Sequence, residues 1–255
     1  MAEIVQSLDR ALNILEIVAK NENGIGIKEL SEQTNLHKST VHRLLHSLIY
    51  KGFVEQNEET GKYSITFKLY ELGINKIQNI DLVKIARPYV EELMDKVDEV
   101  VHLVVRDGNY IVYVDKVESK NTIRMFSTIG KRTPLYCSSV GKAITAYLSE
   151  EEVEEIWNSS DIKKFTPTTI TDFNKFKEEL ESIRKLGYAV DNEEHEIGVR
   201  CIGAPIFNID GKVESAISVS GPSNRMTDEK LDEISNYIKY YANKISERLG
   251  YSIKE

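Results

Sequence analysis

Residues 38–50, Lys-Ser-Thr-Val-His-Arg-Leu-Leu-His-Ser-Leu-Ile-Tyr, decide the N-terminal fold of this 255-residue chain. The valine and the leucines recur at helical spacing, which predicts a helix with one packed face. The opposite face carries hydroxyls, histidines and Arg43, and no acidic residue occurs between Gln33 and Val54. Hydroxyls and a guanidinium at the start of an exposed helix suit contacts with phosphates and base edges.

The flanking residues extend this helix into a larger unit. Apolar periodicity predicts helices over 7–20 and 27–34, and β-rich runs at 53–55 and 63–65 predict a hairpin with Gly61 in its turn. Three helices followed by a hairpin form a winged helix-turn-helix, here residues 1–66, whose second motif helix enters the major groove. The alternative is a protein-interaction module. The residues expected to contact double-stranded DNA are Lys38, Ser39, Thr40, His42, Arg43, Lys62 and Tyr63.

Composition is that of a globular chain, with 41% apolar residues, 29% charged residues and a net charge of −8. Screening at physiological salt limits remote acidic charge to roughly 8 Å, so a basic helix can still dock on DNA. Glu3 and Asp9 interrupt the N-terminal segment where a secretory signal needs apolar residues, and no apolar run of membrane-spanning length occurs. We therefore expect a cytoplasmic protein without a membrane partner, with Cys137 and Cys201 reduced.

The remaining two-thirds of the chain alternates helical and strand patterns. A linker helix is expected over 67–81, and a second domain over 82–255 begins with a helix in which Pro88 lies early. Hairpin signals occur at 107–109 and 210–211. These patterns predict an α+β domain with a largely antiparallel sheet. The expected strands are 100–106, 110–117, 122–128, 199–207 and 213–220, and the expected helices cover 138–148, 172–186 and 227–249, with one more starting at a capping box, 149–152.

Several stretches together resemble the isocitrate lyase regulator (IclR) family of bacterial repressors and activators. They are Ser7 to Leu12, Lys38 to Leu45, Ser139 to Ala143 and Gly187 to Asn208. The resemblance implies a winged helix-turn-helix joined to a GAF-like effector domain, in a homodimer or homotetramer that binds palindromic operator DNA. It also implies a transcriptional regulator, which we expect to be a repressor controlled by a small-molecule effector.

The same resemblance implies an effector pocket. Ser139 would lie in the first turn of a helix, where free N–H groups favour a carboxylate, and Ser218 and Ser220 would point the same way from one strand. These features favour a small hydroxylated or keto acid. The resemblance, which in Thr166 to Ile170 and in the pocket residues is to regulators of sugar-acid breakdown, implies 2-keto-3-deoxygluconate. The residues implied to bind the effector are Met125, Ser139, Val140, Gly141, Asp191, Cys201, Ser218 and Ser220.

Two other kinds of site remain as alternatives. An enzyme would use Cys137 or Cys201 as nucleophile with His102 or His195 as base, but neither cysteine lies in a recognisable nucleophile motif. A zinc site would use Asp191, His195 and Cys201, although their spacing is not that of a compact metal motif. The sequence therefore predicts no catalytic residue, no metal ligand and no cofactor.

Overall fold

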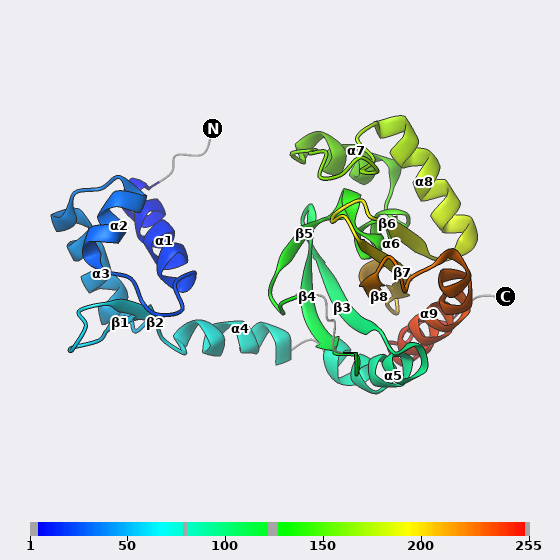
Figure 1. Cartoon of the computed structure of the whole chain (residues 1–255), viewed down its shortest axis with the longest axis horizontal. Helices are drawn as coiled ribbons and strands as arrows, with labels where there is room; N and C mark the ends of the chain where they lie inside the picture. Colours follow the sequence, from blue (N-terminus) through cyan, green and yellow to red (C-terminus); the bar gives the residue numbers. More distant parts are fainter. Residues whose placement is uncertain (1–4, 79–80, 122–126, 253–255) are drawn as a thin grey trace. The chain divides into compact units, whose positions relative to one another are not determined.

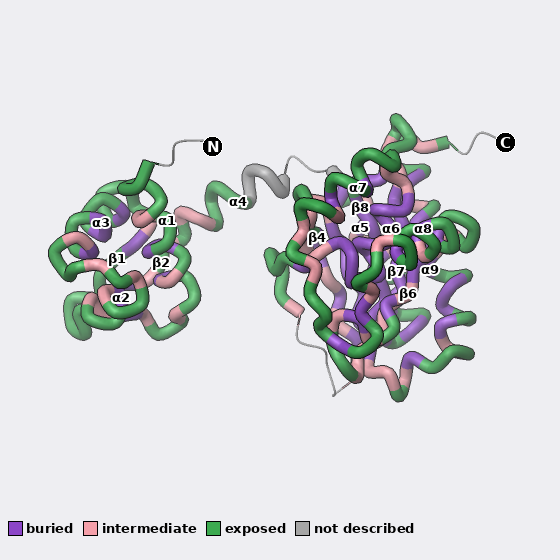
Figure 2. Tube along the Cα trace, turned by 90° about the horizontal axis from the view of Figure 1, so that it is seen from above, coloured by how far each residue is buried: buried purple, intermediate pink, exposed green. Residues whose placement is uncertain are grey.

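The computed structural model describes residues 5–78, 81–121 and 127–252. The chain divides into two compact units, Met1–Asn79 and Ile80–Glu255. Buried residues fill the interior of each unit (Figure 2). Within the described ranges, no helix combines the length and the apolar content that crossing a bilayer requires.

The N-terminal unit contains three helices, a short hairpin and a fourth helix (Figure 1). Its core is built from the apolar faces of α1, α2 and α3, and Leu69 of α4 packs against it. Asn35 ends α2 in the left-handed conformation with φ 53°, which turns the chain into α3. The expected winged helix-turn-helix is confirmed. Its elements are α1 (Gln6–Ala19), α2 (Ile27–Thr34), α3 (Lys38–Tyr50), β1 (Val54–Gln56), β2 (Tyr63–Ile65) and α4 (Lys68–Gln78).

The C-terminal unit is built on one six-stranded sheet in the order β5-β4-β3-β8-β7-β6, and every neighbouring pair is antiparallel. The expected α+β architecture with an antiparallel sheet is thus confirmed. The strands are β3 (Val100–Asp107), β4 (Tyr110–Val117), β5 (Arg132–Pro134), β6 (Ala189–Asn192), β7 (Val199–Phe207) and β8 (Val213–Pro222).

Helices cover both faces of this sheet (Figure 1). α5 and α9 pack together on one face, where Ile217 and Val219 of β8 join their core. Ser218 and Ser220 alternate with those residues and therefore point to the other face, against which α6 packs. The helices are α5 (Asp81–Val97), η1 (Leu135–Cys137), α6 (Ser139–Thr145), α7 (Glu150–Ser159), α8 (Phe173–Leu186) and α9 (Asp228–Arg248).

Several local expectations need correction. Pro88 does not lie early in a helix, because α5 begins at Asp81; burial of Leu82 and Ala86 stabilises the turns before the proline. The expected strand over 122–128 falls mostly outside the described residues, and 127–128 are not in a strand. The helix expected over 138–148 is shorter, and β5 and β6 were not expected from the sequence. The capping box at Ser149 is confirmed.

Candidate nucleic-acid interface and ligand pocket

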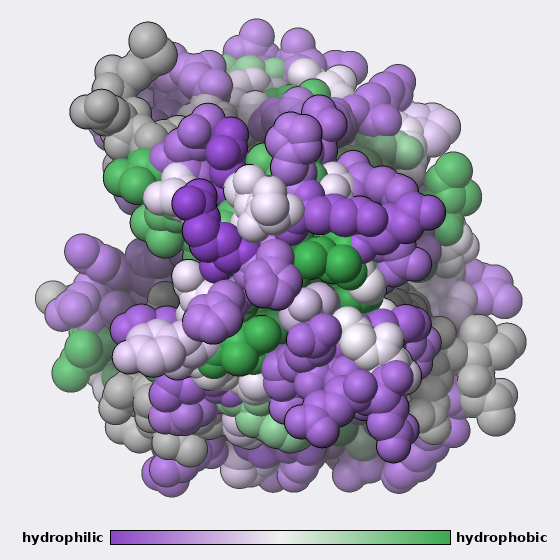
Figure 3. All heavy atoms as spheres, turned by 90° about the vertical axis from the view of Figure 1, so that its left-hand side faces the viewer, coloured by the Kyte–Doolittle hydropathy of each residue, from purple (hydrophilic) through white to green (hydrophobic). Residues whose placement is uncertain are grey.

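Helix α3 has an apolar face and a polar face, as the sequence predicts. Its valine and leucines, Val41, Leu44, Leu45 and Leu48, are buried against the rest of the N-terminal unit. Lys38, Ser39, His42 and Arg43 are exposed, and Thr40 is half-buried. Figure 3 shows one face of the molecule, on which hydrophilic residues predominate. The structure therefore leaves the polar face of α3 available for a partner.

Of the two hairpin residues expected to contact DNA, only one is exposed. Lys62 is exposed at the turn, whereas Tyr63 is 4% exposed and belongs to the core. The backbone of Tyr63 also pairs with that of Ile25, at N–O distances of 2.9 and 3.0 Å. Tyr63 is therefore withdrawn as a DNA contact, because its side chain points into the domain. Glu58 and Glu59 share the turn with Lys62 and are both exposed, so the tip of the wing carries charges of both signs.

A polar pocket lies in the C-terminal unit, on the sheet face that α6 covers. Its volume is about 40 Å³, which is room for a few water molecules. Six of the expected effector residues line it: Ser139, Val140, Asp191, Cys201, Ser218 and Ser220. Met125 lies outside the described residues.

Gly141 does not line this pocket. A Cβ added there would lie 2.2 Å from the carbonyl oxygen of Leu135, so the glycine permits close packing of α6 on the preceding turn. Its N–H donates to Ser138 Oγ at 3.2 Å, which caps the helix. The expected effector contact at Gly141 is replaced by a packing role.

The pocket also contains side chains that the sequence did not connect with one another. Ser127, Ser138, Thr133 and Tyr113 add hydroxyls, while Lys131 and Glu196 are exposed at its edge. No sequence signal marks them as neighbours, because they come from β4, from β5, from the N-cap of α6 and from segments outside the strands, which meet only in the folded domain. The remaining lining residues that sequence analysis did not assign to the effector are His102, His195 and Val199.

His102 is a neutral group in the wall of the pocket. Its Nε2 lies 2.8 Å from Ser127 Oγ, and its Nδ1 lies 3.5 Å from Ser220 Oγ. Burial lowers the pKa of His102 to about 3, and the positive charge of Lys116 acts in the same direction. The imidazole therefore takes part in hydrogen bonds without carrying a charge near neutral pH.

Asp191 is the buried carboxyl of the pocket. Burial raises the pKa of Asp191 to about 7, although its carboxylate accepts a hydrogen bond from the N–H of Glu194 at 2.7 Å. The charge of Glu194 raises this pKa further, whereas Lys142 lowers it. Near pH 7 the group therefore exists in both its neutral and its charged form, and it can donate to or accept from a ligand.

The two cysteines lack the features of a nucleophile. Cys137 Sγ lies 3.6 Å from His195 Nδ1, and Cys201 is in the pocket wall. Burial raises the pKa of both thiols, so neither is a thiolate near neutral pH. In the part of the chain that is described, no three His, Cys, Asp or Glu side chains group so as to hold a metal ion, and this gives the zinc alternative no support.

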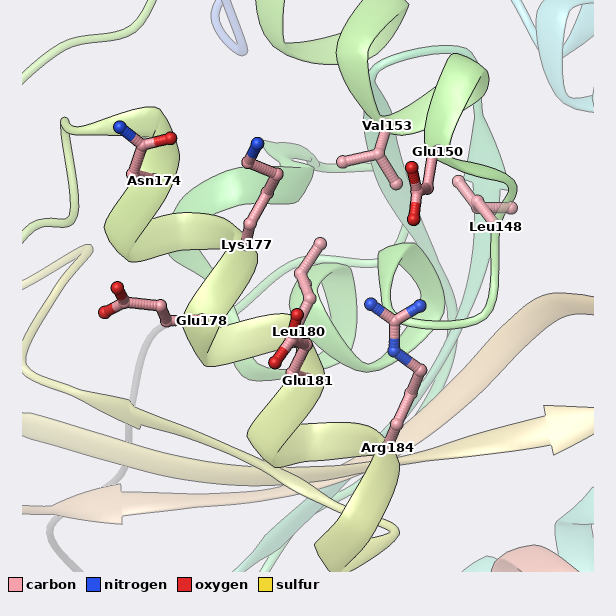
Figure 4. A pocket seen from close by; sticks show the side chains of 9 residues that line it. All are labelled: Leu148, Glu150, Val153, Asn174, Lys177, Glu178, Leu180, Glu181 and Arg184. Carbon is pink, nitrogen blue, oxygen red and sulfur yellow. The ribbon is translucent and has the colours of Figure 1, made fainter.

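A second hollow lies between α7 and α8 (Figure 4). Glu150, Glu181 and Arg184 contribute charges of both signs, and Leu180 and Val153 form an apolar part of its wall. None of the expected site residues lines it. The polar pocket under α6 is therefore the better candidate for a ligand.

A winged helix with an exposed basic face and a separate domain with a polar pocket define the class of DNA-binding regulators that sense a ligand. The description "Bacterial transcriptional regulator IclR C-terminal" matches residues 74–247, and "IclR helix-turn-helix domain" matches residues 7–58. The chain therefore belongs to the IclR family of bacterial transcriptional regulators, which confirms the resemblance seen in the sequence. These relatives are regulators and not enzymes, so the cysteine-nucleophile alternative is set aside.

Individual relatives align with this chain over almost its whole length. HTH-type transcriptional regulator KdgR of Escherichia coli K12 is 39% identical, covering 97% of this chain and 94% of that protein. HTH-type transcriptional repressor AllR of the same strain is 36% identical, covering 96% and 90%. The crystal structure of the Thermotoga maritima IclR is 38% identical, with a TM-score of 0.81 and coverage of 97% and 100%.

Proposed function

We propose that this protein is a cytoplasmic repressor that binds palindromic operator DNA as a homodimer or homotetramer and responds to a small carboxylic acid. The observation that carries the proposal is the polar pocket of the C-terminal unit, in a chain whose other unit exposes the basic face of α3. The effector shifts the population between two arrangements of the protein and so changes operator affinity.

The lining of the pocket favours an acid with several hydroxyl or keto groups. Hydroxyls of Ser139, Ser218 and Ser220 can donate to and accept from such a ligand. Ser139 and Val140 also belong to the first turn of α6, whose N–H groups have no partner within the helix. A sugar acid or keto acid uses both features, and 2-keto-3-deoxygluconate is the first to test.

The DNA-binding part of the proposal depends on Lys38, Ser39, Thr40, His42, Arg43 and Lys62. A second copy of the chain is favoured by the surface at the start of α1, where the N-cap residue Val5 and the helical residues Leu8 and Leu12 are 63%, 58% and 50% exposed. These side chains follow one another at helical spacing, and a two-fold contact between such stripes matches the symmetry of a palindromic site. AllR, a relative of this chain, is itself named a repressor.

The test uses full-length protein and an operator selected from random duplexes by mobility shift. Addition of 2-keto-3-deoxygluconate should release the DNA, whereas glucose, which lacks the carboxylate, should not. Ser220→Ala should reduce the response to the acid, and Ser252→Ala, a matched change at an exposed position, should preserve it. Failure to select any duplex would refute the proposal that the protein is a DNA-binding regulator. Release of the DNA by glucose would refute the proposal that the effector is a carboxylic acid.

A further inference from the structure

Lys142 is a fully buried cation behind the pocket. It lies on α6 with 0% exposure, and an ammonium in such a place costs several kcal/mol unless it is paired and hydrogen-bonded. Its Nζ donates to the carboxylate of Glu194, to that of Glu179 at 2.8 Å and to the carbonyl oxygen of Val190 at 2.7 Å. All three of its donor positions are therefore used.

Two of these acceptors flank a residue of the pocket wall. Val190 precedes Asp191 in β6, and Glu194 follows it by three residues, next to His195. The N–H of Glu194 donates to Asp191 Oδ1 at 2.7 Å. The ammonium of Lys142 thus holds the segment that carries both Asp191 and His195 to the cavity.

The same segment is fixed from its other side by threonine hydroxyls. Thr169 Oγ1 donates to the carbonyl oxygen of Glu194 at 2.6 Å, and Thr168 Oγ1 donates to that of Glu193 at 2.9 Å. These bonds hold the backbone at 193–194, whereas Lys142 holds the carbonyl of Val190 and the side chain of Glu194. Lys142 is therefore a hydrogen-bonded contact between the segment and α6, whose first turn also lines the pocket.

Stability alone does not account for a buried lysine here. Apolar side chains in place of a buried ion pair often leave the stability of a protein unchanged or raise it. The pair is also incompletely satisfied, because Glu194 Oε2 is buried without a hydrogen-bond partner in the described part of the chain. What the pair supplies is a defined geometry.

We propose that Lys142 is a positioning residue of the effector pocket, which holds the 190–198 segment against α6 and so directs Asp191 and His195 at the ligand. This inference rests on the proposed function, since it takes the pocket to be the effector site. Its contacts with Val190 and Glu194 carry this role, and its contact with Glu179 of α8 does not reach the segment.

The experiment compares two variants of the full-length protein. Lys142→Met combined with Glu194→Gln replaces the buried pair by neutral side chains, and Glu179→Gln, the matched control, removes only the negative charge of the acceptor on α8. Calorimetry with 2-keto-3-deoxygluconate should show at least a tenfold loss of affinity in the double variant and a change within twofold in the control. If the double variant does not fold, Lys142→Arg takes its place in the test. It keeps the charge but on a larger planar group, and it should give the same loss of affinity.

A second measurement needs no ligand. The amide proton of Glu194, hydrogen-bonded to Asp191, should shift upfield in Lys142→Met alone, and segment 190–198 should exchange its amide hydrogens faster in the double variant, while Glu179→Gln changes neither. An unmoved Glu194 amide, or full affinity in a folded double variant, overturns the role of Lys142. If the unaltered protein binds no acid, the proposed function fails, and the amide measurement still decides the role of Lys142.

Discussion

His102 Nε2 and Ser127 Oγ lie 2.8 Å apart in the wall of the pocket. Because burial lowers the pKa of His102 to about 3, the folded protein resists protonation of this ring while the unfolded chain accepts a proton near pH 6.5. His102 therefore contributes stability that is present above about pH 6.5 and is lost as the pH falls toward 3. His102→Gln should flatten this acid dependence, measured by urea unfolding with the fluorescence of Trp157, the only tryptophan. The exposed His37→Gln is the control, and an equal effect of both substitutions would contradict the prediction.

Asp191 should contribute a pH dependence of opposite sign. Its pKa is raised from 3.8 to about 7, so the folded state retains a proton that the unfolded chain releases between those values. Stability should fall as the pH rises through this window, because a charged carboxylate must then be buried. Asp191→Asn keeps an acceptor for the N–H of Glu194 and should stabilise the C-terminal unit at pH 8 by roughly 1–4 kcal/mol. The same substitution at pH 4 should change the unfolding midpoint little, and equal stabilisation at both pH values would refute the explanation.

The affinity for the effector should depend on the protonation state of the Asp191 carboxyl group. An acid bound next to Asp191 is repelled by its charged form, so the affinity for 2-keto-3-deoxygluconate should fall as the pH rises through about 7. Asp191→Asn should remove this dependence between pH 6 and 8, as measured by calorimetry. A wild-type affinity that is flat over this range would show that the carboxylate of the ligand binds away from Asp191.

Two glycines determine how closely α6 packs. Gly141→Ala places a Cβ 2.2 Å from a backbone oxygen of Leu135, and should cost about 3 kcal/mol or more in stability. Gly203→Ala places a Cβ 2.9 Å from the backbone of Ser139 and Val140, and should cost roughly 1–3 kcal/mol while weakening effector binding. Gly73→Ala on α4 meets nothing within 4 Å and should be neutral or slightly stabilising. Chemical denaturation measures all three, and a tolerated Gly141→Ala would contradict the packing role.

Helix α3 could be predicted from the sequence because the residue pattern that specifies it lies within the helix itself. The apolar spacing of residues 38–50 specifies both the bounds and the buried face of α3, and the structure agrees on both. Tyr63 was misassigned because a strand of three residues has too little alternation to show which side faces the core. Its pairing with Ile25, nearly forty positions earlier, decides that.

The pocket could be predicted only in part, because its wall is assembled by long-range pairing. Ser218 and Ser220 were readable as one face of a strand, and the family resemblance placed Asp191 and Cys201 with them. His102 joins them because it pairs with Ser218 in the register of β3 and β8, which no local pattern specifies. Lys142 lay within a recognised motif, but its burial and its three acceptors depend on β6 and α8, far along the chain.

Arg43 should be the most informative position for DNA recognition. It is exposed on the polar face of α3, beside His42, while Leu44 and Leu45 hold the helix from the other side. A guanidinium in the major groove discriminates a base pair by about 1–3 kcal/mol, so Arg43→Ala should weaken specific operator binding by roughly 5- to 150-fold. Lys20→Ala, an exposed basic residue at the end of α1, controls for the loss of one charge and should reduce specific and non-specific binding only slightly. Mobility shifts at two salt concentrations distinguish base recognition from phosphate contact, because loss of a base contact leaves the salt dependence unchanged. Operator affinity that is equal for Arg43→Ala and Lys20→Ala would mean that this face of α3 does not read the operator.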